Sequence, residues 1–247
     1  MMKICLVLVL IFISISNSSF SQRFKKPIDY RFKNGELGYL SFFSKNITFP
    51  LQSIEKGTIG NSIVRISLNP KGEITKTEII NPIDISIDRE VFRAIDLSEN
   101  LWKACDTINH NQVFYIQIAF SLSGFQPNLY RPKSKEIQSL FPEPIIITLH
   151  EQMKSELSKE DELKITFIKT EEISGKANSN LDIGKLEEAL PFINELIKRD
   201  PFNRDLYKVR IMINIKLKRP ELVERDDNKI YNFADGFSLA ELNKDQD

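Results

Sequence analysis

A β-hairpin is the feature that most constrains what this chain can fold into. Val64, Ile66 and Leu68 alternate with polar residues, and this period of two is typical of a half-buried strand. The next four residues, Asn-Pro-Lys-Gly at 69–72, form strong turn chemistry, because proline presets its own φ and glycine tolerates positive φ. Residues 73–80 then return as a second strand, so the sequence predicts two antiparallel strands joined by a tight turn.

Helical and extended patterns lie on both sides of the hairpin. Residues 38–46 hold a helix-like cluster of apolar side chains, and a short turn of helix is expected at 51–56. Residues 87–99 repeat apolar side chains at helical spacing, with Ser86 in position to cap the helix. Residues 113–122 form a strand that is dense in aromatic and β-branched side chains. The order helix, strand, strand, helix, strand predicts an α+β domain.

The rest of the chain favours helices. Residues 123–162 read as a connector that contains prolines and ends in a charged helix. Residues 163–219 form a helical region with an antiparallel helical hairpin in its second half, although both strand and helix stay open for 163–168. Residues 220–247 make an acidic tail, and a charge run of this kind is usually solvated or disordered.

The first residues determine the compartment. Lys3 precedes an unbroken apolar run at 6–15, and a polar stretch with small residues then ends at Ser21. This pattern predicts a signal peptide at 1–21, cleaved between Ser21 and Gln22, because a transmembrane helix needs about 20 apolar residues. We therefore expect an exported protein, periplasmic or associated with the cell envelope, in which residues 22–37 are a lead-in linker. A retained apolar segment would instead anchor the chain in the inner membrane.

The composition gives catalysis and nucleic-acid binding little support. Basic and acidic residues balance at 34 each, and the two histidines, His110 and His150, are far apart with no metal-ligand spacing around them. No phosphate loop or nucleophile motif occurs, so we expect no cofactor, no metal site and no enzymatic activity. The pair His150-Glu151 or the acidic pair Glu171-Glu172 could do acid–base chemistry in principle, but a solvated face is the simpler interpretation. Cys105 is expected to be a small buried apolar residue.

Residues 38–122 resemble the C-terminal domain of TonB, in the form common in exported proteins of Bacteroidetes. The resemblance depends on the order and spacing of Phe49-Pro50, Gly57, Gly60, the turn at 69–72, Trp102-Lys103-Ala104 and the strand at 113–122. The chain departs from the family at Ala104-Cys105 and at Asn111-Gln112, which concern one loop. Residues 170–218 resemble a degenerate tetratricopeptide repeat through Gly184, Leu186, Ala189, Ile193, Leu196 and Pro201.

The resemblance implies protein binding. Domains of the TonB type pair an extended peptide of an outer-membrane receptor with a strand of their sheet, and the physical basis is β-augmentation at a strand edge. The matching strand here is 113–122, and the expected contact is the backbone of Tyr115, Ile116, Gln117, Ile118 and Ala119. We therefore expect an envelope protein that binds partner peptides by strand addition. The alternative is an energy transducer of the TonB type that keeps its N-terminal anchor.

Overall fold

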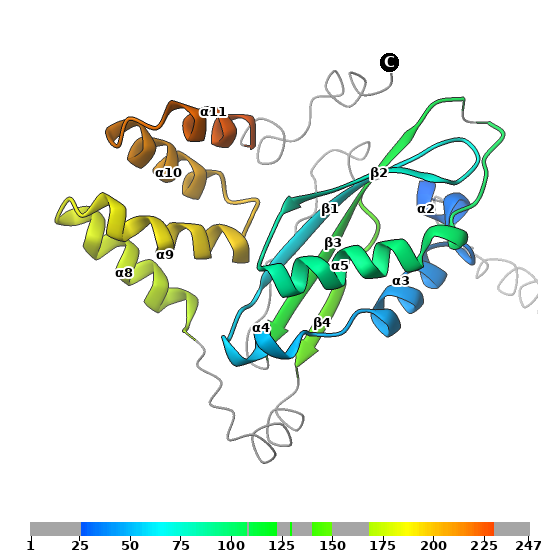
Figure 1. The fold of residues 1–247 in the computed structure, drawn as a ribbon, viewed down its shortest axis with the longest axis horizontal. Coiled ribbons are helices and arrows are strands. Elements are labelled where there is room, and N and C mark those ends of the chain that lie inside the picture. Colours follow the sequence, from blue (N-terminus) through cyan, green and yellow to red (C-terminus); the bar gives the residue numbers. More distant parts are fainter. Residues whose placement is uncertain (1–25, 108, 123–128, 130–139, 150–167, 230–247) are drawn as a thin grey trace, which may run out of the picture.

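The computed structural model describes residues 26–107, 109–122, 129, 140–149 and 168–229. Its centre is a four-stranded sheet in the order β2-β1-β3-β4 (Figure 1). The strands are β1 Gly60–Leu68, β2 Ile74–Asn81, β3 Gln112–Leu122 and β4 Ile145–Leu149. β1 pairs in antiparallel fashion with β2 and with β3, and β4 runs parallel to β3. The predicted α+β class and the hairpin are confirmed.

The N-terminal helices and α5 lie on one face of the sheet (Figure 1). They are α2 Pro27–Arg31, α3 Gly35–Asn46, α4 Leu51–Glu55 and α5 Ile85–Leu97, followed by the short 3₁₀ helix η1 Glu99–Leu101. The helix predicted at 87–99 is confirmed as α5, but Ser86 is not its cap. The Asp84 carboxylate accepts hydrogen bonds from the backbone N–H groups of Ser86 and Ile87 instead.

The main core lies between these helices and the sheet. Side chains of alternate β3 residues point into it, and Trp102 fills the space between α5 and the strands. The Trp102 indole N–H donates to the Ser98 hydroxyl, and its ring meets the ring of Phe32 edge-on with centroids 4.9 Å apart. The polar end of this large side chain is therefore satisfied inside the core.

The other face of the sheet is also covered. Ile63, Val113 and Tyr115 form a second cluster there with Phe141, and the partly buried Phe202 packs against it. Because both faces of β3 are buried, its sequence is a nearly continuous apolar run and not an alternating one.

The C-terminal helices form two successive pairs beside the sheet (Figure 1). They are α8 Thr170–Asp182, α9 Leu186–Arg199, α10 Arg204–Lys216 and α11 Pro220–Lys229. The end of α9 contacts the start of β1, where the Asn61 side chain donates a 2.6 Å hydrogen bond to the Arg199 carbonyl. The helical region therefore packs on the sheet.

The expectation of a solvated run from residue 220 onward is wrong for residues 220–229, which form α11. The reason is a buried ion pair, in which Arg210 on α10 donates two hydrogen bonds of 2.7 Å to the carboxylate of Asp226. Asp226 is fully buried, so the acidic stretch supplies a structural counter-ion as well as solvated charge.

Several predictions lie outside the described residues. These are the signal peptide with its cleavage site at Ser21 and Gln22, most of the connector at 123–162 and of the open segment at 163–168, and the tail beyond residue 229. Within the described part of the chain, no helix combines the length and the apolar character needed to cross a bilayer.

Candidate functional site

The site to consider is the edge of β3 that faces away from β1. On the β1 side, the pairing runs from Gln112 opposite Leu68 to Phe120 opposite Gly60. On the other side, β4 pairs only with the last five residues of β3, from Ile118 opposite Ile145 to Leu122 opposite Leu149. Among the described strands, β3 is therefore an inner strand along part of its length only.

The five residues predicted to contact a partner fall on both parts of this strand. Ile118 and Ala119 have a strand on each side, whereas Tyr115, Ile116 and Gln117 precede the point where β4 begins. All five side chains are buried. The prediction that their backbone binds a partner stays a prediction, and at Ile118 and Ala119 it requires β4 to leave.

The segment that covers this edge, residues 140–149, is called the strap here. In its first half, the Phe141 ring stacks on the Tyr115 ring with centroids 5.0 Å apart and planes 15° apart. Pro142 and Pro144 have no N–H to donate, so this half is poorly suited to a regular ladder. The second half is β4, which covers the edge by backbone pairing, whereas Phe141 packs against Tyr115 on the face of the sheet.

The side chains of β4 alternate between the core and the outside. Ile145 is 1% exposed and lies in the main core, and Leu149 is buried in a smaller cluster with Ile54, Ile59 and Leu122. Ile146 is 47% exposed. The Thr148 hydroxyl makes a 2.8 Å hydrogen bond with the Ser121 hydroxyl on β3. An added strand at this position therefore needs branched apolar residues at every second place.

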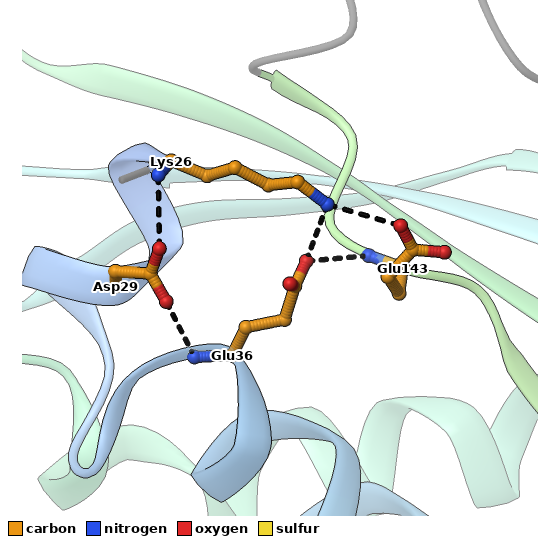
Figure 2. Close-up of polar contacts among 4 residues, drawn as sticks. All are labelled: Lys26, Asp29, Glu36 and Glu143. Carbon is orange, nitrogen blue, oxygen red and sulfur yellow. Dashed lines mark hydrogen bonds and ion pairs between the residues drawn. The ribbon is translucent and has the colours of Figure 1, made fainter. Parts of the chain in front are cut away.

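A polar cluster holds the strap just before β4 begins (Figure 2). The Lys26 ammonium donates to a Glu36 carboxylate oxygen at 2.7 Å and to a Glu143 carboxylate oxygen at 3.0 Å. The backbone N–H of Glu143 donates to the same Glu36 oxygen at 3.3 Å. Asp29 completes the arrangement, because its carboxylate accepts from the backbone N–H groups of Lys26 and Glu36. The cluster joins the start of α2, the start of α3 and the strap.

The charged side chains of this cluster differ in how deeply they are buried. Glu36 is almost fully buried, whereas Lys26 and Glu143 keep about a third of their side-chain surface. Burial by itself lowers the pKa of Lys26, but its hydrogen bonds to Glu36 and Glu143 outweigh burial and raise it. Burial, together with the charges of the same two carboxylates, keeps the pKa of the nearby Tyr39 hydroxyl well above its ordinary value. Lys26 therefore stays charged and shares its single positive charge between two carboxylates.

Sequence reasoning missed both the strap and the cluster. The run Ile-Ile-Ile-Thr-Leu at 145–149 has β propensity and prolines before it, and those signals could have identified a strand. Nothing in the sequence brings Lys26 and Glu143 together, because 117 positions separate them.

The expectation for Cys105 is wrong. The residue is half-buried, and its thiol lies 3.2 Å from the Thr107 hydroxyl. The hydrogen bond with Thr107, supported by the positive charge of Arg31, lowers the pKa of this thiol. The described residues contain no group of three or more histidine, cysteine or acidic side chains placed to hold a metal ion.

Comparisons with models of protein families, with curated proteins and with solved structures gave no match to this chain.

Proposed function

We propose that the chain is an exported, non-catalytic interaction protein of the cell envelope, and that it binds an extended partner segment by strand addition to β3. Residues 38–122 would act as a TonB C-terminal-like unit in this role. The observation that supports the proposal best is β4 itself. It is a five-residue strand that follows β3 after residues 123–144 and lies parallel on an edge that five-residue partner segments would also fit.

Physical chemistry favours this edge over the opposite one. The outer strand β2 carries Lys76 and Glu78 with exposed side chains, and charged residues on an edge discourage the addition of another strand. The β3 edge is apolar, and its backbone groups at residues 118–122 already pair with one strand, β4. A partner that replaces β4 recovers the same backbone hydrogen bonds and the same buried apolar surface.

A cysteine lock tests the proposal. Ser121 and Thr148 are register partners on β3 and β4, so replacing both with cysteine in a Cys105→Ser background gives a pair that can close into a disulfide. The control lock replaces Ser67 and Lys76, which pair β1 with β2 and leave the β3 edge alone. The probe is a fluorescent peptide with the sequence of residues 140–149 and a soluble tail.

The tethered β4 competes at an effective concentration of about 1 mM, so the probe is expected to bind weakly to the unmodified full chain. Oxidation of the Ser121–Thr148 lock should abolish binding, and reduction should restore it. Oxidation of the control lock should leave binding unchanged. Binding that survives the closed Ser121–Thr148 lock, or the absence of any binding in the reduced protein, refutes strand addition at β3.

A further inference from the structure

The polar cluster beside β4 bears on which partner the β3 edge can select. Glu143 stands two residues before the first strand residue, Ile145, and its carboxylate lies on Lys26. Lys26 has a second, buried carboxylate at Glu36, with which it forms the shorter contact of 2.7 Å. The cluster therefore has a permanent part, Lys26 with Glu36, and a part that belongs to the strap.

When the strap moves away from β3, Lys26 loses one of its two carboxylate partners, Glu143. The Lys26 ammonium has three donors, and without Glu143 the carboxylate that remains on it is Glu36. Glu36 also loses the backbone N–H of Glu143, which lies 3.3 Å from its oxygen. A partner strand with any residue other than proline at this place can restore the backbone N–H, but only an acidic side chain restores the second carboxylate on Lys26.

We propose that the partner segment carries an acidic residue two positions before an uncharged strand of five residues, in which the first, third and fifth are branched apolar side chains. This inference rests on the proposed function. The acidic side chain takes the place of Glu143 on Lys26, and the three apolar side chains take the places of Ile145, Ile147 and Leu149. The segment runs parallel to β3, as β4 does.

The acidic residue also fixes the register. A shift of one residue would turn the apolar side chains of the incoming strand away from the core. It would also move the carboxylate away from Lys26 by about 3.3 Å, which is the rise of one strand residue. Specificity therefore comes from the ion pair and the apolar pattern, because both are satisfied in the same register of the incoming strand against β3.

The test compares two peptides on the full chain. The first carries residues 140–149, and the second has glutamine in place of Glu143. Because the ion pair is partly exposed, the first peptide should bind about two- to fivefold more tightly. The ratio should fall to about one on a Lys26→Gln protein, should return on Lys26→Arg, and should be unchanged on Lys185→Gln, a control at an exposed pair with Glu188.

The outcomes separate this inference from the proposed function. If both peptides bind equally to the unmodified chain, the acidic requirement is wrong while strand addition stands. If the affinity ratio of the two peptides stays the same on Lys26→Gln, another group binds the peptide carboxylate and the assignment to Lys26 is wrong. If neither peptide binds, the proposed function fails, and this inference fails with it. If Lys26→Gln does not fold, the peptide ratios on the unmodified chain and on Lys26→Arg decide the matter.

Discussion

Replacing Asn61 with alanine should weaken the contact between the sheet and the helical region, because this side chain joins them from a fully buried position. Its amide N–H₂ donates to the Arg199 carbonyl at 2.6 Å, and its carbonyl oxygen accepts from the Gln117 amide at 3.2 Å. Alanine removes both hydrogen bonds and leaves their partners buried without them.

The size of the effect follows from the two polar groups that lose their hydrogen bond to Asn61, the Arg199 carbonyl and the Gln117 amide. Each buried polar group left unsatisfied costs about 1–3 kcal/mol, so the expected loss in the free energy of unfolding for the two groups is about 2–6 kcal/mol. For a chain of this size, each 1 kcal/mol lowers the midpoint of thermal unfolding by about 2–4 °C, and a loss of about 3 kcal/mol gives roughly 6–12 °C. Urea denaturation, followed by circular dichroism, measures the free energy directly.

The matched control is Asn180→Ala. The Asn180 amide makes one exposed hydrogen bond of 3.4 Å, to the Glu188 carbonyl within the helical region, so its loss should cost less than about 0.5 kcal/mol. If Asn61→Ala unfolds at the same urea concentration as the control, the buried hydrogen bonds of Asn61 do not hold the two regions together.

Two further predictions concern the fold around the site. A Cβ atom at Gly60 would lie 2.8 Å from the Lys198 carbonyl oxygen, so Gly60→Ala should destabilise the chain by about 1–3 kcal/mol in urea titrations. A Cβ atom at Gly175 would meet no atom within 4 Å, so the control Gly175→Ala should not destabilise the chain. Equal urea midpoints for the Gly60 and Gly175 variants would contradict this prediction. Burial alone would raise the pKa of Glu90, but hydrogen bonds from Arg93 and Thr48 outweigh it and lower the pKa. The stabilising contribution of Glu90 is therefore present above the ordinary pKa and is lost as pH falls through the lowered pKa. In that pH window, Glu90→Gln should reduce the loss of unfolding free energy with falling pH. An unchanged dependence of stability on pH would refute this.

Much of the first domain could be predicted from local signals. The turn at 69–72 and the period of two in β1 define the hairpin, and the apolar spacing of α5 defines its helix. The sequence places the cap of α5 at Ser86, two residues after the true cap, because Asp84 and Ser86 are both good caps and only the structure shows which one bonds.

The candidate site could be predicted only in part. The long apolar run of β3 predicts a strand, but β4 is a run of only five residues, four of them apolar, and it could equally belong to a buried helix. Its parallel pairing depends on a long connection that no local pattern encodes. The same holds for the bond from Asn61 to Arg199 and for the contact between Lys26 and Glu143, which join residues more than a hundred positions apart.

The central claim is that the β3 edge accepts a strand from another molecule in place of β4, and amide hydrogen exchange of the full chain tests it most directly. With a saturating amount of the 140–149 peptide, the amides of the protein's own residues 145–149 should exchange faster, while those of residues 118–122 in β3 should stay protected. If residues 145–149 keep their protection although the peptide is bound, the peptide binds elsewhere and the claim is wrong.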